Sequence, residues 1–164
     1  MRGEQRGVRK WDRRKREMCI RARGYLMIGT NDLDKAVAFY GQLGPLVGAK
    51  RAATDPGRFV MWGNGNGAML AVTKPHDGNP ATVGNGVMPA IAAPSKEVVD
   101  QFHAKALELG ATNEGDPGPR TDHFYGGSFR DLDGNKLVVV HLCLSPKARS
   151  YKHGASYVGA CLFT

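Results

Sequence analysis

Three side chains in the second half of the chain have the types and spacing needed for acid–base chemistry. Arg120, His123 and Tyr125 lie close together, and the last two are separated by one residue. On a strand, that spacing puts both side chains on one face. An imidazole titrates near neutral pH, a phenol donates a proton, and a guanidinium orients an anion. The pattern predicts either an acid–base site or the rim of a polar pocket. The alternative is that His123 is a half-exposed strand residue and Tyr125 packs in the sheet.

The other histidines offer weaker candidates. His103 is expected on a helix, with its side chain in solvent, and His141 is expected near the end of the last strand, toward the helix side. His76 and Asp77 fall in a long stretch of turn-forming residues. Because such a stretch can cross the mouth of a pocket, these two remain candidates for contact with a ligand.

Two motifs resemble ligand-binding loops, but the sequence predicts turns at both. The run GNGNG at 63–67 is followed by a strand pattern, so it lacks the helix N-terminus that holds a phosphate. The run DLDGN at 131–135 lacks the ligand spacing and the terminal glutamate of a calcium loop. Both are predicted to be hairpin turns.

The elements that must position these residues are predicted to occur twice in the same order. The first half reads as a strand at 25–30, a helix capped by Asn31 and ended by Gly44-Pro45, and strands near 48–52, 58–62 and 68–73. The second half reads as a strand at 86–93 that contains Pro89, a helix opened by Pro94-Ser95, and strands near 111–114, 123–130 and 136–142. Repetition of this unit predicts an α+β fold with two tandem βαβββ modules.

This architecture predicts where a ligand would bind. Each module is expected to form a curved mixed sheet with its helix on one face, which leaves the other face concave. The modules are expected at 25–73 and 86–142, joined by a linker at 74–85, with a central cleft between them. A concave face is where a small molecule would bind.

The net charge of +8 comes from the ends of the chain. Residues 1–24 hold ten Lys or Arg against three acids, and the body is nearly neutral. We expect 1–24 to be a flexible extension and 143–164 an irregular tail. Three origins of the extension remain open: a nucleic-acid-binding arm, a targeting segment, or residues ahead of a start at Met18 or Met27. Three scattered cysteines predict no disulfides, and with no membrane span or secretion signal we expect a cytoplasmic protein.

The repeated order of elements, the opening run IGTNDLDKAVAFY at 28–40 and the closing run FRDLDGNKLVVV at 129–140 resemble the glyoxalase/bleomycin-resistance/dioxygenase group, or vicinal oxygen chelate superfamily. The stretches at 74–86, 98–120 and 123–136 look like a bacterial subgroup of glyoxalase-like proteins without an assigned reaction. The resemblance covers roughly residues 25–142. It implies the two-module fold and a homodimer.

Members of this group that use a metal take ligands, usually His or Glu, from four strand positions. The resemblance puts these positions at Tyr25, Leu70 or Ala71, Met88 and Val138. None is a His, Asp or Glu, so we expect no metal and no other cofactor. The resemblance also places Trp62 where similar folds line a pocket. There it could stack on a flat ligand, or it could pack in the core.

Two functions follow from this comparison. The first is a glyoxalase-like protein that binds a small organic molecule between its modules and acts as a metal-independent lyase or isomerase through Arg120, His123 and Tyr125. The alternative is a non-catalytic binding protein of the bleomycin-resistance type. In both, the expected ligand-binding residues are Tyr25, Trp62, Leu70, Met88 and Val138. No membrane partner is expected, and contact with nucleic acid through 1–24 is a weaker third hypothesis.

Overall fold

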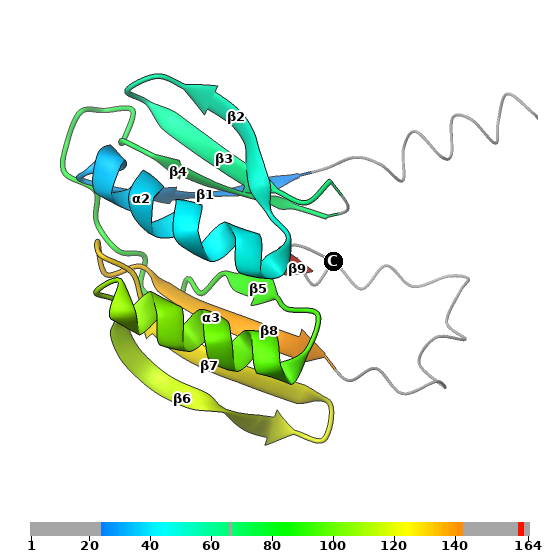
Figure 1. The fold of residues 1–164 in the computed structure, drawn as a ribbon. Helices are drawn as coiled ribbons and strands as arrows, with labels where there is room; N and C mark the ends of the chain where they lie inside the picture. The colour runs from blue at the N-terminus through cyan, green and yellow to red at the C-terminus, as the bar shows by residue number, and fades with distance from the viewer. Residues whose placement is uncertain (1–23, 66, 143–160, 163–164) are drawn as a thin grey trace, which may run out of the picture.

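The computed structural model describes residues 24–65, 67–142 and 161–162 (Figure 1). The first module consists of β1 (Tyr25–Gly29), α2 (Leu33–Leu43), the 3-10 helix η1 (Gly44–Val47), β2 (Lys50–Asp55), β3 (Phe59–Gly63) and β4 (Met69–Thr73). The second consists of β5 (Ala90–Ala92), α3 (Lys96–Glu108), β6 (Thr112–Thr121), β7 (Phe124–Arg130), β8 (Lys136–Leu142) and β9 (Cys161–Leu162). The predicted α+β fold with two βαβββ modules is confirmed. The predicted extension, except Gly24, and the predicted tail, except β9, lie outside the described residues.

Both sheets are mixed, as predicted. The first has the strand order β1-β4-β3-β2, and the second has the order β6-β7-β8-β5-β9. In each module the first strand runs parallel to the last strand of the repeat, β1 beside β4 and β5 beside β8. Helix α2 packs against β4, α3 packs against β7 and β8, and the two helices contact each other (Figure 1). No helix among the described residues is long and apolar enough to span a membrane.

The elements differ from the sequence predictions at several boundaries, and the largest difference is β6, which spans 112–121 where the sequence predicts a strand near 111–114. The cap of α2 is Asp32 rather than Asn31, because the Asp32 carboxylate accepts the Lys35 amide at 3.1 Å while Asn31 bonds elsewhere. Strand β5 spans only 90–92, so the linker runs from 74 to 89 instead of ending at 85. Pro89 accounts for this, since it has no N–H for a sheet hydrogen bond.

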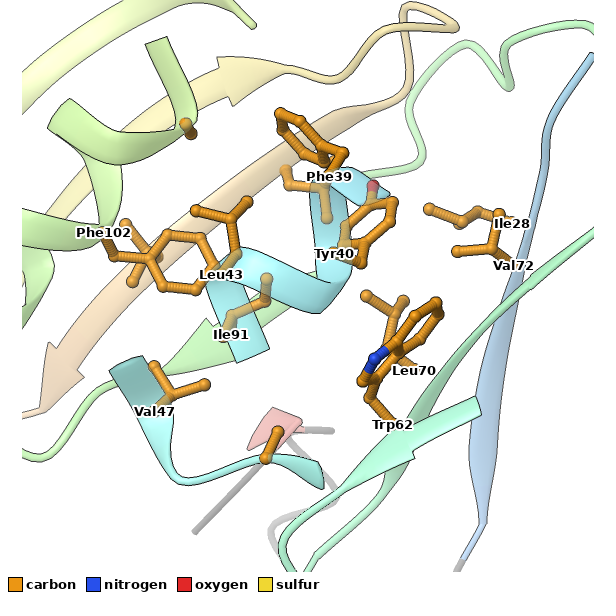
Figure 2. Packing of buried hydrophobic residues seen from close by; sticks show 14 of the residues in the cluster. Ile28, Phe39, Tyr40, Leu43, Val47, Trp62, Leu70, Val72, Ile91 and Phe102 are labelled. Carbon is orange, nitrogen blue, oxygen red and sulfur yellow. The ribbon is translucent and has the colours of Figure 1, made fainter. Parts of the chain in front are cut away.

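One hydrophobic core spans both modules (Figure 2). Helix α2 contributes Phe39, Tyr40 and Leu43, and the second module contributes Ile91 and Phe102. All five side chains are almost fully buried. The faces of the sheets that lie beneath the helices are therefore filled with side chains.

A second contact between the modules is polar and involves the turn at 131–135, which we call the inter-module turn. The Tyr40 hydroxyl on α2 donates to the buried Asp131 carboxylate at 2.7 Å. The same carboxylate accepts the backbone amides of Asp133 at 3.0 Å and Asn135 at 2.8 Å. Asp131 thus orders its own turn and holds the helix of the other module.

The rest of the inter-module turn binds the segment between β1 and α2. The Asp133 carboxylate accepts the Thr30 hydroxyl at 2.5 Å and the Asn31 amide at 2.8 Å. The Asn135 side chain donates to the Gly29 carbonyl at 3.0 Å. These bonds join residues about one hundred positions apart, so they fix how the two modules sit together.

Removal of the Tyr40 hydroxyl should weaken the protein. We expect Tyr40→Phe to lower the free energy of unfolding by about 2 kcal/mol, since a buried carboxylate loses one donor. The measurement is urea unfolding at pH 7. Tyr25→Phe is the matched control, because Tyr25 is exposed. Equal stability of the two variants would show that the Tyr40–Asp131 bond contributes nothing.

The same pair makes a pH prediction. Burial, and then the Asp131 charge, raise the pKa of Tyr40 well above its usual range. A raised pKa stabilises the folded state below the pKa of the unfolded chain, about 10, and that contribution is lost as the pH rises further. The stability difference between wild type and Tyr40→Phe should therefore shrink above pH ~10.

Candidate functional site

Each sheet has a face that packs against its helix and a face directed away from it, which we call the open face. On β8, Leu137 and Val139 belong to the core, so strand alternation puts Val138 on the open face. On β1, Tyr25 and Met27 alternate with core residues and are 56% and 40% exposed. A ligand can reach this face only in places, because Val138 is just 5% exposed whereas Tyr25 and Met27 lie open to solvent.

Trp62 and Leu70 do not lie on the open face. They are paired across β3 and β4, are 4% and 2% exposed, and pack beneath α2 (Figure 2). The Trp62 ring lies 5.9 Å from that of Tyr40. Both residues therefore pack in the core. For Trp62 this is core packing, the second of the two roles that the sequence left open. Of Leu70 and Ala71, it is Ala71 that lies on the open face. An error of one residue in a predicted strand position assigns a side chain to the opposite face of the sheet.

The four positions that metal-using members of the group employ do not fit a metal ion in this chain. Tyr25 lies exposed on β1, Leu70 lies in the core, Met88 lies on the linker and Val138 lies on β8. Only the tyrosine offers an oxygen donor, and a thioether suits soft ions alone. Within the described ranges, no three His, Cys, Asp or Glu side chains are grouped to hold an ion.

A pocket of about 580 Å³ lies between the linker and the second sheet, and we call it the linker pocket. Residues 83–88 form its linker side, and Arg130 and Lys136 form its sheet side. The two cations are paired across β7 and β8, and Lys136 shares a face of β8 with Val138. The pocket is therefore on the open side of the second sheet.

The two cations of the linker pocket share one carboxylate. Glu114 on β6 accepts Arg130 Nε at 2.5 Å and Lys136 Nζ at 2.9 Å. Hydrogen bonds from Lys136 and then Arg130 hold the pKa of Glu114 below its usual value. Arg130 Nη1 also donates to the Gly134 carbonyl at 2.8 Å. The cluster carries a net charge of +1.

The linker is anchored to the first module at its midpoint. The Asn31 side chain accepts the Ala81 amide at 2.7 Å and donates to the Ala81 carbonyl at 3.2 Å. His76 and Asp77 precede this anchor and are not part of the pocket lining. Asp77 instead accepts the Asn79 side chain at 2.9 Å, which with the Asn79 amide lowers the pKa of Asp77.

A second pocket, of about 320 Å³, lies between the start of α3 and the β6–β7 hairpin, and we call it the hairpin pocket. Its lining comprises Lys96, Pro119, Arg120, Thr121, Asp122, Phe124 and Tyr125. Arg120 and Tyr125 thus border one pocket, whereas His123 is exposed in the hairpin turn and is not part of this lining. Because β7 begins at Phe124, the expected strand alternation does not relate His123 to Tyr125.

The Tyr125 phenol is already engaged. Its hydroxyl donates to Asp100 on α3 at 2.8 Å, and this bond, together with burial, raises the pKa of Tyr125. Lys96 Nζ lies 5.5 Å from the ring centroid. Tyr125 is therefore on the helix side of its sheet, away from the open face, and it keeps its proton as the donor to Asp100.

Of two further histidines, only His103 lies where the sequence did not predict it. His103 was expected in solvent but is buried, with Nε2 3.2 Å from the Ser128 carbonyl. His141 places Nδ1 3.1 Å from the Ala93 carbonyl. Arg130 and Lys136 are not among the predicted site residues, although they flank the DLDGN turn symmetrically and must pair across any hairpin formed there.

The family model for the Glyoxalase/Bleomycin resistance protein/Dioxygenase superfamily matches residues 23–139. A glyoxalase/bleomycin resistance protein from Albidiferax ferrireducens T118 is 34% identical, with a TM-score of 0.65 over 72% of this chain and 96% of that one. No curated protein matches.

Two more distant structures share the fold. A glyoxalase/bleomycin resistance protein/dioxygenase family enzyme from Burkholderia phytofirmans PsJN is 22% identical, with a TM-score of 0.60 over 73% of this chain and 97% of that one. A lactoylglutathione lyase from Agrobacterium tumefaciens is 23% identical, with a TM-score of 0.53 over 73% of this chain and 92% of that one. At these identities the similarity concerns the fold alone.

Proposed function

The chain belongs to the glyoxalase/bleomycin resistance protein/dioxygenase superfamily, and from that premise we propose that it binds a small organic molecule in the linker pocket. The observation that carries the proposal is the pocket itself. Its volume of about 580 Å³ falls within the range of about 300–1,000 Å³ typical of small-molecule sites. It also joins an uncharged linker wall to two convergent cations.

The space between the helices of the two modules is a poorer candidate. The void beside Tyr40, Trp62 and Phe102 measures about 10 Å³. Such a volume accommodates about one water molecule. A ligand between the modules therefore has to bind outside this core. The linker pocket meets this condition, because the segment that joins the two modules forms one of its walls.

We favour binding without catalysis over acid–base turnover. Catalysis by Arg120, His123 and Tyr125 requires three groups around one substrate, and His123 is not in the lining of the hairpin pocket. The observation in favour of the enzyme is that Arg120 and Tyr125 share that pocket. Turnover that is lost in His123→Ala while ligand affinity persists would establish the enzyme instead.

We also infer a homodimer, as the family resemblance implies, and a cytoplasmic location, as the few scattered cysteines suggest. Strand β1 is an edge strand of its sheet, and Tyr25 and Met27 expose apolar surface on it. Light scattering coupled to size exclusion should give twice the chain mass. Tyr25→Glu should shift the protein toward the monomer, and a monomeric wild type would contradict this inference.

The first experiment is a thermal-shift screen with a panel of small carboxylates, phosphates and neutral aromatic compounds. A ligand that binds only the folded state raises the melting temperature by mass action. We expect at least one class of compound to do so. A panel without any such compound would contradict the proposed function.

A variant that fills the pocket tests where the compound binds. Val87→Trp should abolish most of the ligand-induced shift, because a larger side chain occupies the pocket wall. The melting temperature without ligand should stay unchanged, since Val87 is 51% exposed. Gln101→Trp on the exposed side of α3 is the control for the added indole. An unchanged ligand response in Val87→Trp would move the site elsewhere.

A further inference from the structure

We propose that the linker pocket selects an organic anion, namely a molecule with an apolar body and a single carboxylate or phosphate group. This inference rests on the proposed function and adds the chemical class of the ligand. Among the residues that line the pocket, the linker contributes only uncharged side chains from 83–88, and both charged groups, Arg130 and Lys136, are cations. A neutral ligand would leave this charge unmatched.

The cations keep hydrogen-bonding capacity for a ligand. Arg130 uses Nε on Glu114 and Nη1 on Gly134, and its Nη2 group bonds no residue that the structure describes. Lys136 has three donors and uses one on Glu114. Because Glu114 offsets only one of the two positive charges, a second anion is electrostatically favoured.

The surroundings strengthen this attraction. The side chains of Arg130 and Lys136 are only 37% and 34% exposed, and charges that are partly removed from water interact more strongly than charges in bulk solvent. A guanidinium beside an ammonium suits the several oxygens of a carboxylate or phosphate. The anionic group of the ligand is thus placed on the sheet side of the pocket.

The apolar body is assigned to the opposite wall. Val83, Val87 and Met88 are large hydrophobic residues on the linker that remain exposed. A ligand that covers them removes apolar surface from water on both partners. The pocket therefore matches an amphipathic molecule better than a small inorganic anion, which would leave this wall in water.

Three matched probes test the class: naphthalene-2-carboxylate, 2-naphthyl phosphate and the uncharged naphthalene-2-carboxamide. Calorimetric titration of the full chain should show both anions binding at least tenfold more tightly than the amide. Preference for one anion over the other identifies the source of the charge, and either preference supports the proposal. Binding of the anions should weaken as salt is raised.

Charge variants make the test specific to the linker pocket. Arg130→Gln and Lys136→Gln should each weaken binding of the carboxylate by roughly three- to tenfold, which corresponds to a partly exposed charge pair. Glu114→Gln should strengthen it by about threefold, because the competing carboxylate is gone. Lys50→Gln removes one charge from the first sheet and should change nothing. Melting curves without probe show whether each variant is folded. If Arg130→Gln does not fold, Lys136→Gln provides the test.

Different outcomes distinguish a failure of the anion class from a failure of the proposed function. Equal affinity for the amide and the carboxylate, or weaker anion binding in Glu114→Gln, would overturn the anion class while the pocket still binds ligands. Failure of all three probes, together with a thermal-shift panel without any stabilising compound, would overturn both this inference and the proposed function. Loss of anion binding in Lys50→Gln would move the charge effect away from this pocket.

Discussion

Asp131→Ala should lower the free energy of unfolding by roughly 3–5 kcal/mol, since several buried or partly buried donors lose their acceptor at about 1–3 kcal/mol each. Those donors are the Tyr40 hydroxyl, the amides of Asp133 and Asn135, and the Asn135 side chain. The loss should exceed that of Tyr40→Phe, because the turn and the contact between modules fail together. Urea unfolding followed by tryptophan fluorescence measures it.

Two controls identify the cause of the Asp131 effect. Asp122→Ala removes a carboxylate from the exposed β6–β7 turn and should change the stability by less than about 0.5 kcal/mol. Asp131→Asn keeps the shape of the side chain and one acceptor oxygen, so its free energy of unfolding should lie between those of wild type and Asp131→Ala. If Asp131→Ala costs no more than Asp122→Ala, the inter-module turn does not hold the modules together.

Trp62→Ala should lower the free energy of unfolding by about 3–5 kcal/mol, as is typical when a buried aromatic side chain is removed. Trp62 packs against Tyr40 and Leu70 beneath α2 (Figure 2). Because the linker pocket is lined by other residues, ligand affinity should change by less than about twofold wherever the variant remains folded. Chemical unfolding and calorimetric titration of the best compound measure the two quantities.

The matched control for Trp62 is its neighbour Met61. Adjacent strand residues point to opposite faces, so Met61 lies on the open side of β3. Met61→Ala should destabilise the protein less than Trp62→Ala, since Met61 is only partly buried. A Trp62→Ala variant that keeps its stability but loses ligand affinity would restore the pocket role that similar folds suggested for this residue.

The sequence predicted the order of elements because the periodicity of single helices and strands is a local property. Tyr40 and Leu43 mark one face of α2, and Val99 and Phe102 mark one face of α3, at spacings that the chain itself displays. The predicted start of β5 was wrong for a local reason too, because the strand begins only after Pro89, later than the apolar content of 86–93 suggested.

The faces of the strands were harder to predict, because a shift of one residue inverts them. Leu70 and Ala71 are both apolar and both fully buried, so hydrophobicity does not tell which of them faces α2. The contact partners in the fold decide it. His103 shows the same limit, since its burial depends on packing against Phe129 from another element.

The polar contacts between distant segments were outside the reach of sequence reasoning. The DLDGN run was predicted as a turn, and the structure has a turn there, but its partners Tyr40 and Thr30 precede it by about one hundred residues. Glu114, likewise, meets Arg130 and Lys136 only because β6, β7 and β8 are neighbours in one sheet. Without the strand order, the three charges look like ordinary surface residues.

The proposed function requires that a small molecule binds between the linker and the open side of the second sheet. A titration of ¹⁵N-labelled protein with the best compound of the thermal-shift panel, followed by amide NMR, tests it most directly. We expect chemical-shift changes at the amides of Gly84, Gly86 and Lys136, with the amides of 121–125 unchanged. Changes confined to 121–125, with the linker amides unchanged, would place the ligand in the hairpin pocket and contradict binding in the linker pocket.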